Sequence, residues 1–163
     1  MPEHREVRVL PYTPEQLFDL VADVGRYGEF LPWVIATRVK SQSDTEMVAD
    51  MIVGFKVFRE TFTSRVVLDR PRHIHIDYIS GPLKFLYNDW RFKAVGAGTE
   101  VDFHVDFAFR QSILNTLAGA YFHEAFRKMV TAFETRAAKV YAAAGGVSGA
   151  SSGSSSSSAQ RTA

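Results

Sequence analysis

The chain has 163 residues, of which 46% are hydrophobic and 13% aromatic, and it contains no cysteine. This length and apolar content suit one domain with a sizeable core, and the lack of cysteine excludes disulfide scaffolds and cysteine-ligated metal sites. Apart from Arg161 in the C-terminal tail, 18 basic residues balance 18 acidic ones. The body therefore lacks the positive charge with which DNA-binding proteins meet phosphates, and we expect no DNA partner.

The N-terminal segment predicts a strand at about Arg5–Leu10 rather than a targeting signal. Its sequence, MPEHREVRVL, alternates charged and aliphatic residues and has no apolar core of the kind found in signal peptides. No stretch approaches the ~20 apolar residues of a membrane span, and a chain without cysteine suits a reducing compartment. We therefore expect a soluble, cytoplasmic protein.

The next segment, YTPEQLFDLVADVGRYGEFLPW, predicts a short helix that runs into an apolar turn. Thr13 and Gln16 can form a capping box, and Pro14 occupies the first helical position, where its missing N–H costs nothing. We expect this helix to end at Gly25 and a second short helical piece to follow it. Apolar residues recur at helical spacing, so one side should press on a sheet; they are Leu17, Phe18, Leu20, Val21 and Val24.

A run of strands should follow, because short segments rich in alternating apolar residues are separated by the turn sequences SDT, DRP, SGP and GAG. No helix connects one strand to the next, so the sheet should be antiparallel. In the last strand, Val101, Phe103 and Val105 alternate with polar residues, which predicts one buried and one solvated face. The predicted strands are 34–41, 46–55, 60–68, 72–79, 84–94 and 99–109.

A long helix is predicted from Ser112 to about Ala143, with a length of about 45 Å, enough to cross the concave face of the sheet. Beyond it lies a Gly/Ser-rich tail that cannot bury enough apolar surface to order itself. We divide the chain into one domain, 1–144, and a disordered tail, 145–163. The apolar stripe of the helix comprises Ile113, Leu114, Leu117, Tyr121, Phe122, Phe126, Met129, Phe133, Ala137, Val140 and Tyr141.

Three segments together resemble the START-like ubiquinone-binding proteins of the Coq10 family: residues 12–33, GPLKFLYNDWRF at 81–92, and MVTAFETRAAKVY at the end of the last helix. The same family includes RatA-like ribosome-association toxins. The resemblance covers residues 3–141. It implies an α+β helix-grip (START-like) fold, in which a curved antiparallel sheet wraps around a long C-terminal helix, with two short helices near the N-terminus.

The resemblance also implies a function: non-enzymatic binding of ubiquinone, or of a similar isoprenoid lipid, in a hydrophobic tunnel, in support of respiratory electron transport or quinone biosynthesis. The quinone would be a ligand, and no cofactor is expected. By periodicity alone the same aromatic rings would simply pack against one another; the resemblance favours a tunnel. The alternative within the family is a RatA-like protein that binds the large ribosomal subunit and blocks subunit association.

Tunnel residues are carried over from the family motif or taken from the predicted inner faces. The resemblance places Leu31, Pro32 and Trp33 at the mouth, and Trp90 and Phe92 in the wall. One contact to the quinone head could come from Tyr78, Tyr121 or the indole N–H of Trp90, and the sequence does not distinguish among them. The face assignment adds Phe103, Phe107, Phe122, Phe126 and Met129.

The apolar turn also has a second interpretation as a membrane contact. Together with the segment around Lys84 it would form an exposed apolar rim, with the lysine ammonium near anionic headgroups and the protein peripheral to the inner membrane. An equally favoured alternative is that the two loops fold over each other and are buried. The residues of this rim are Phe30, Leu83, Lys84, Phe85 and Leu86.

Two polar strand faces look superficially like metal sites. They carry His73, His75 and Asp77 on one strand, and Asp102, His104 and Asp106 on another. The strand between them supplies further charges, namely Asp89, Arg91 and Lys93. A lattice of opposite charges across a solvated surface therefore explains the pattern better, and we expect no metal site.

Enzymatic signatures are missing: the sequence has no G-x-S-x-G elbow, P-loop, G-x-G-x-x-G or H-E-x-x-H motif. We expect a protein that is not an enzyme. A polyketide cyclase-like activity, which belongs to the same superfamily, ranks last because titratable residues are scarce on the predicted inner faces. For the ribosome-binding alternative, the candidate surface is the basic cluster of Arg65, Arg70 and Arg72.

Overall fold

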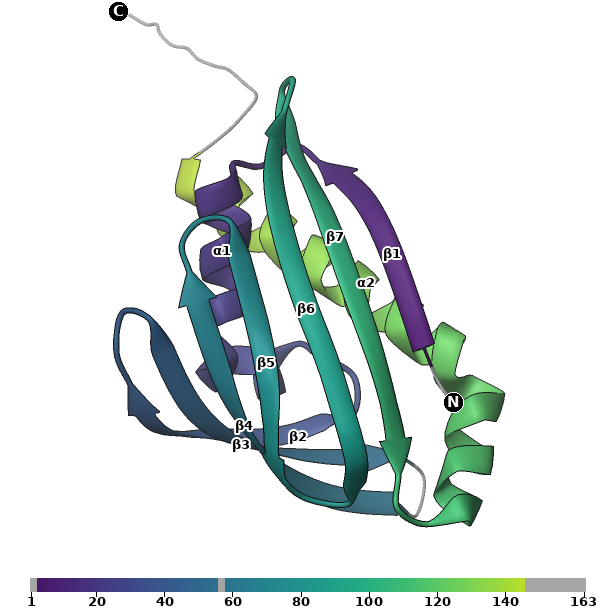
Figure 1. The fold of residues 1–163 in the computed structure, drawn as a ribbon. Coiled ribbons are helices and arrows are strands. Elements are labelled where there is room, and N and C mark those ends of the chain that lie inside the picture. The colour runs from purple at the N-terminus through teal and green to yellow at the C-terminus, as the bar shows by residue number, and fades with distance from the viewer. Residues whose placement is uncertain (1–2, 56–57, 146–163) are drawn as a thin grey trace, which may run out of the picture.

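One antiparallel sheet of seven strands wraps around a long helix in the computed structural model, which describes residues 3–55 and 58–145. Within that part of the chain the strand order is β1-β7-β6-β5-β4-β3-β2 (Figure 1). The predicted α+β helix-grip arrangement is confirmed. The elements are β1 (Glu3–Leu10), α1 (Pro14–Ala22), the 3-10 helix η1 (Val24–Glu29), β2 (Val34–Gln42), β3 (Glu46–Phe55), β4 (Phe58–Asp69), β5 (His73–Ser80), β6 (Leu83–Val95), β7 (Gly98–Phe109) and α2 (Ser112–Gly145).

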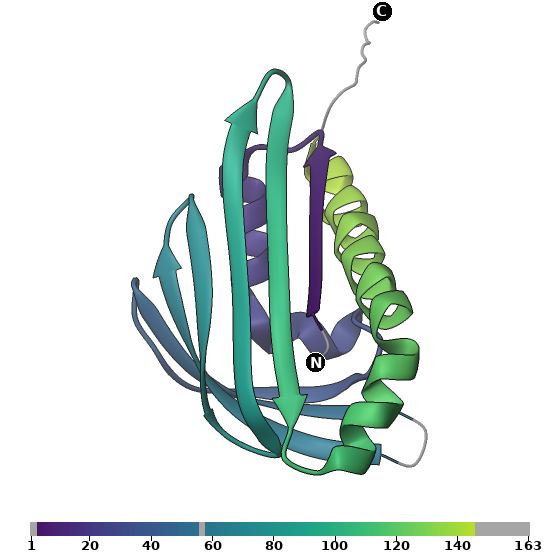
Figure 2. The ribbon, with the colours of Figure 1, turned by 45° about the vertical axis from the view of Figure 1, so that its right-hand side comes forward.

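The two short helices lie on the concave side of the sheet. β1 and β2 are consecutive strands in the sequence but form opposite edges of the sheet, so α1 and η1, which connect them, pass across the concave face. In Figure 2 the strands curve around these helices, and α2 runs along the open side next to β1. The curved sheet, α1 and α2 therefore enclose one interior.

The cap of α1 is as predicted, whereas its end is not. The Gln16 amide donates to Thr13 Oγ1 at 3.1 Å, and the Thr13 amide donates to Gln16 Oε1 at 3.0 Å. The helix ends at Ala22, three residues before the predicted end at Gly25, and η1 begins at Val24. One physical reason is the Tyr27 hydroxyl, which donates to the Val21 carbonyl. This bond satisfies a carbonyl that a longer helix would have used.

The apolar side chains of the strands and of α1 form the core as the alternation predicts. Phe103 and Ile74 are each 1% exposed, and Val101 and Val105 are also buried, while the residues between them on β7 are half-buried. The four residues predicted to face inward on α1 are buried as well. The core therefore lies between the concave face, α1 and the second half of α2.

The apolar stripe predicted for α2 is correct in its second half and wrong at two positions. Phe133 and Ala137 are buried, but Ile113 is 69% exposed and Val140 is 37% exposed. Ile113 lies in the first turn, directly after β7, where the helix has not yet come over the concave face. Near the other end Tyr141 donates its hydroxyl to the Gln16 carbonyl, which turns the neighbouring Val140 outward.

Three of the predicted stripe side chains, Leu117, Tyr121 and Phe122, lie outside the described residues, and so does 146–163, nearly all of the predicted tail. Among the helices that are described, none has both the length and the apolar character needed to cross a membrane.

Candidate functional site

Aromatic rings fill the centre of the interior. The Trp90 ring lies 4.4 Å from the ring of Phe103 and 5.3 Å from that of Phe133, between ring centroids. Phe126 of α2 adds a further ring 6.0 Å from Phe103. Trp90 on β6 and Phe103 on β7 are register partners, so the two strands bring their rings together directly. Phe133 then closes over them from α2.

A small cavity remains beside these rings, between β1, α1, β6, β7 and α2. Its volume is about 20 Å³, room for about one water molecule, whereas ligand pockets typically measure ~300 to 1,000 Å³. Among the described residues, this cavity is therefore far smaller than the tunnel that the resemblance implies, because the rings of Trp90, Phe103 and Phe133 occupy the space beside it. The cavity is lined by Glu6, Arg8, Leu10, Leu17, Leu20, Val21, Trp90, Phe92, Val101, Phe103, Val130 and Phe133.

The expectation that titratable residues are scarce on the inner faces is wrong for β1. His4, Glu6 and Arg8 point inward, and their side chains are 9%, 16% and 27% exposed. Val7 and Val9 face outward and are 53% and 64% exposed. The physical reason is that the inner face of this edge strand meets charged residues of α2 as well as the core. The alternation of β1 suggests that the valines face the core, so the inward orientation of His4, Glu6 and Arg8 could not be predicted from it.

These polar residues form a seam between β1 and α2, made of His4, Glu6, Arg8, His123 and Glu134. Arg8 Nη1 donates to Glu134 Oε1 at 2.8 Å, and its Nε donates to Glu6. Nδ1 of His4 lies 3.3 Å from Nδ1 of His123, and His4 Nε2 lies 3.0 Å from Glu6 Oε1. The seam thus joins α2, the helix that covers the open side of the sheet, to the edge strand β1 by polar contacts. Two residues of the seam, Glu6 and Arg8, also line the cavity.

The predicted wall residues Trp90, Phe92 and Phe103 all line the cavity. Phe107, Phe126 and Met129 lie further along the interior and are only half-buried, with the Phe107 and Phe126 rings 6.2 Å apart. The side chains of Tyr121 and Phe122 lie outside the described residues. The structure therefore brings the described wall residues together along one side of the interior.

Tyr78 has a structural partner at a turn. Its hydroxyl accepts a hydrogen bond from the Leu83 amide at 2.9 Å. A side chain at Gly81, which has a φ of +142°, would lie 3.1 Å from the same hydroxyl. Tyr78 is not among the residues that line the cavity, so the geometry does not favour it as the contact for a quinone head.

The predicted mouth residues are packed in different ways. Leu31 is buried, and Pro32 and Trp33 are half-buried. Trp33 has a φ of +66°, a left-handed conformation that is strained for a bulky side chain. Its carbonyl accepts a hydrogen bond from the Gly54 amide at 2.8 Å, which ties the turn to β3. The apolar turn is therefore held against the body of the protein.

The residues of the predicted rim do not come together. Phe30 lies 5.4 Å from the Phe133 ring, with the Arg136 guanidinium 4.9 Å from its centroid. Leu83 is 3% exposed and pairs with Phe109, just before α2 begins. Along α2 these two places are about 30 Å apart. Lys84 is exposed, while Phe85 and Leu86 are half-buried.

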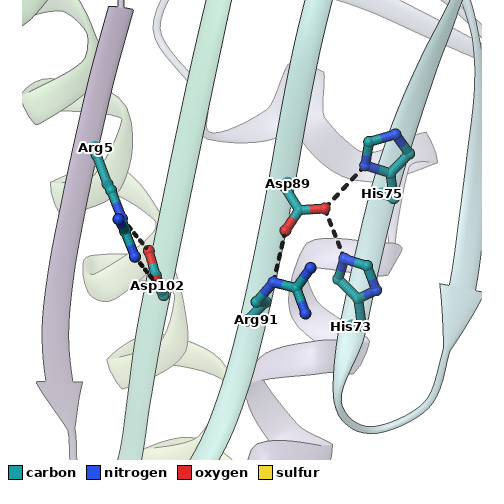
Figure 3. A network of polar contacts seen from close by, with 6 residues as sticks. All are labelled: Arg5, His73, His75, Asp89, Arg91 and Asp102. Atoms are coloured by element: carbon teal, nitrogen blue, oxygen red, sulfur yellow. Dashed lines mark hydrogen bonds and ion pairs between the residues drawn. The ribbon is translucent and has the colours of Figure 1, made fainter.

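The convex face carries the expected lattice of charges. Arg5 on β1 donates to both carboxylate oxygens of Asp102 on β7, at 3.1 and 2.7 Å, and Arg91 donates to Asp89 at 3.0 Å (Figure 3). Asp89 is only 4% exposed. Burial alone would raise the pKa of this carboxyl group, but hydrogen bonds from His73 and His75 outweigh burial and lower it.

Local ion pairs neutralise the basic cluster proposed for ribosome binding. Arg70 donates to both oxygens of Asp19 on α1, at 2.8 and 2.9 Å. Arg72 pairs with Asp69 at 3.0 Å, and Arg65 pairs with Glu46 at 3.4 Å. Each of the three arginines therefore has an acidic partner, and together they do not form a patch of uncompensated positive charge.

Comparison with known proteins agrees with this architecture. Ribosome association toxin RatA of Rickettsia prowazekii is 38% identical over 141 residues, which cover 83% of this chain and 96% of that protein. The mitochondrial coenzyme Q-binding protein COQ10 homolog B of Xenopus laevis is 32% identical over 85% of this chain and 59% of its own length. Among solved structures, the ZhuI aromatase/cyclase from Streptomyces sp. R1128 superposes with a TM-score of 0.77, at 20% identity, over 89% of this chain and 98% of that one.

The predicted resemblance to the Coq10 and RatA-like proteins is thereby confirmed. The family model described as "Polyketide cyclase / dehydrase and lipid transport" matches residues 10–134, which include α1, all strands except β1, and the first two thirds of α2. The chain therefore belongs to the polyketide cyclase/dehydrase and lipid transport family.

Proposed function

We propose that this protein is a non-enzymatic binder of a polyprenyl quinone, ubiquinone or a close relative, and supports quinone function in respiratory electron transport or quinone biosynthesis. The observation that carries the proposal is the apolar, ring-lined interior between the concave sheet and α2, where a small cavity remains beside Trp90, Phe103 and Phe133. An isoprenoid tail offers only apolar area, so its affinity comes from burial at about 25 cal/mol per Å². The lipid-transport family and the coenzyme Q-binding relative support this choice of ligand.

Binding requires the closed interior to open, and we propose that it opens at the first half of α2. Among its described side chains, Val130 is the first that is buried. Before it, Phe126 and Met129 are half-buried, with the Phe126 ring near that of Phe107. A ligand tail that enters between this half of the helix and the sheet would pass the described apolar side chains Phe107, Phe126 and Met129, with His4 beside Phe126, on its way to Trp90. Displacement of the Phe126 and Phe133 rings then enlarges the cavity.

We place the quinone head beside the charged residues of β1 that line the cavity. Among the described residues, Glu6 and Arg8 are the charged ones that line the cavity, and Arg8 carries several N–H donors. A quinone carbonyl is a hydrogen-bond acceptor, so we propose that Arg8 donates to it. To do so, the guanidinium would give up part of its present contact with Glu6. Arg8 thus joins the three candidates named from the sequence, Tyr78, Tyr121 and the indole N–H of Trp90; of these, Tyr78 does not line the cavity and Trp90 does.

Exchange of a membrane lipid requires contact with a bilayer, for which we propose the turn around Lys84. The Arg110 amide donates to the Pro82 carbonyl at 3.0 Å, which brings the start of α2 beside this turn. Lys84 and Arg110 are exposed cations there, and Ile113 is an exposed apolar side chain. The combination is suited to anionic headgroups and lies at the loosely packed end of α2.

The test is organic extraction of the purified protein from quinone-producing cells, followed by mass spectrometry. Val130→Phe enlarges a side chain that lines the cavity, and Val140→Phe makes the same change on the exposed side of α2. We expect quinone to accompany the wild type and Val140→Phe, and to fall at least tenfold in Val130→Phe. Failure to recover lipid from the wild type, or equal recovery from Val130→Phe with an unchanged melting temperature, would refute the proposal.

The proposal assigns no catalytic step to this chain. The solved aromatase/cyclase shares the fold at 20% identity, a similarity that carries over no chemistry. A polyketide cyclase-like activity would use acid or base groups on the inner faces; we assign His4, Glu6 and Arg8 to contacts between β1 and α2 and to the quinone head instead.

A second candidate function, association with the ribosome, is favoured by the RatA relative at 38% identity. Its test is the gradient profile of ribosomes in cells that overproduce the protein, where free subunits should accumulate. Arg72→Glu, at an exposed position, should reduce this effect if the basic cluster is the contact, whereas Val130→Phe should leave it unchanged. An unaltered profile with the wild type rules this function out.

A further inference from the structure

Three side chains of the kinds that bind metals converge on the convex face, on the other side of the sheet from the cavity. His73 and His75 are two residues apart on β5, and Asp89 lies opposite His75 on β6. Asp89 Oδ1 is 2.6 Å from His73 Nε2 and 2.8 Å from His75 Nδ1. The ligand atoms of the three residues all lie within 4.8 Å of one another. Figure 3 shows both imidazoles turned toward the same carboxylate oxygen.

Two of these side chains are also held by a second partner. His75 Nε2 lies 3.2 Å from Asp77 Oδ1, so the Asp77 carboxylate orients the ring and leaves Nδ1 facing Asp89. The other oxygen of Asp89, Oδ2, accepts from Arg91 Nε at 3.0 Å. Histidines that bind a metal usually donate their other ring N–H to a carboxylate or carbonyl oxygen, which fixes the ring.

A lattice of opposite charges, which the sequence predicts for this face, accounts for the pairing of Arg91 with Asp89. It does not require two imidazoles to meet at a single carboxylate oxygen that is almost fully buried, with one of them braced by a second carboxylate. The other histidine on this face, His104, shows the simple arrangement, with its Nε2 2.7 Å from the exposed carboxylate of Glu3.

We propose that His73, His75 and Asp89 form a binding site for Zn²⁺ or a similar late first-row divalent cation, with a fourth position open to water. Imidazole nitrogen and carboxylate oxygen are common zinc ligands, at bond lengths near 2.0 to 2.2 Å in tetrahedral geometry. Such ligand atoms are about 3.3 Å apart. The cation therefore replaces the two hydrogen bonds to Asp89 Oδ1 and lengthens these contacts by about 0.5 to 0.7 Å.

The test is a calorimetric titration of the full chain, without a histidine tag and stripped by a chelator, with Zn²⁺. Co²⁺ serves as a spectroscopic probe. We expect one saturable site and the visible absorption of tetrahedral Co²⁺. His75→Gln removes a ligand and should weaken binding more than tenfold, and Asp77→Asn, which removes only the brace, should weaken it by about tenfold.

Two matched controls locate the site. His104→Gln changes a histidine on the same face outside the cluster, and His123→Gln changes one of the neighbouring imidazoles of the seam. Both should bind Zn²⁺ with wild-type affinity. The proposal fails if the wild type shows no saturable site, if His75→Gln binds as the wild type does, or if binding disappears in His123→Gln.

Discussion

Arg8 links the sheet edge to the lid helix, and it does so from within the interior. Its guanidinium contacts Glu6 on its own strand and Glu134 on α2, while its side chain lines the cavity. A partly buried contact of this kind holds α2 against β1 more firmly than an exposed ion pair does, because solvent screens it less. Loss of this contact should therefore loosen the helix without unfolding the sheet.

We predict that Arg8→Met, which keeps the apolar stem, speeds amide hydrogen exchange in α2 around Glu134 about fivefold. This corresponds to a local opening free energy that is lower by about 1 kcal/mol. Arg5→Met is the matched control, because Arg5 lies on the outer face of the same strand and pairs with Asp102. Hydrogen exchange measured by NMR checks the prediction. Equal acceleration in the two variants, or none in Arg8→Met, would show that Arg8 does not hold the helix.

Tyr27 ties η1 to the end of α1 through its hydroxyl, which donates to the Val21 carbonyl in the core. Burial raises the pKa of this hydroxyl far above its ordinary value, and the Asp23 carboxylate acts in the same direction. In the unfolded chain a tyrosine loses its proton near pH ~10. Above that pH the unfolded state binds fewer protons than the folded state, so the free energy of unfolding falls as the pH rises.

Tyr27→Phe should lower the free energy of unfolding by about 1 kcal/mol near neutral pH, because the Val21 carbonyl loses its donor. The variant should also lose less stability than the wild type between neutral pH and pH ~11. Urea titrations at several pH values measure both effects, with Tyr87→Phe on the exposed convex face as the control. A parallel alkaline decline in wild type and Tyr27→Phe contradicts the role assigned to burial.

Among the elements, α2 divides into two halves with different packing. Val130, Phe133 and Ala137 bury the second half against the core. In the first half, Ile113 is exposed and a side chain added at Gly119 would meet nothing within 4 Å. Glycine in a helix interior is less favourable than alanine because it loses more backbone freedom on folding. Judged by its described residues, the first half of α2 therefore has fewer stabilising features than the second.

Gly119→Ala should stabilise this half of the helix by about 0.5 to 1 kcal/mol. If the ligand passes beneath it, the same change should slow the release of bound quinone to vesicles while leaving the quinone content of the purified protein unchanged. Stopped-flow transfer to acceptor vesicles measures the release. Faster release, or a lower melting temperature, contradicts the assignment of this half as the moving part.

The elements themselves could be predicted well from local signals. The Thr13 cap, the turns and the alternation in β7 each depend on a few neighbouring residues, and the structure confirms them. β1 could not be oriented in this way, because Val7 and Val9 are the apolar residues of the strand and yet face outward. Its orientation depends on Glu134 and His123, which lie more than a hundred residues away and supply polar partners for the inner face.

In the whole molecule, the sequence predicts which rings face the interior but not how completely they fill it. Trp90, Phe103 and Phe133 come from two strands and a helix, and only their packing decides that about 20 Å³ remains. The convex face illustrates the same limit. The spacing of His73 and His75 is visible in the sequence, but the position of Asp89 between them depends on the register of β5 with β6.

Trp90 makes the central claim directly measurable, because it lies at the cavity and the chain has only one other tryptophan, Trp33. In a Trp33→Phe background, the fluorescence of Trp90 is recorded while a short-chain ubiquinone, a quencher of indole emission, is added. We predict saturable quenching that is lost in Val130→Phe and kept in Val140→Phe. Quenching that does not saturate, or that is the same in both valine variants, would contradict a quinone site beside Trp90.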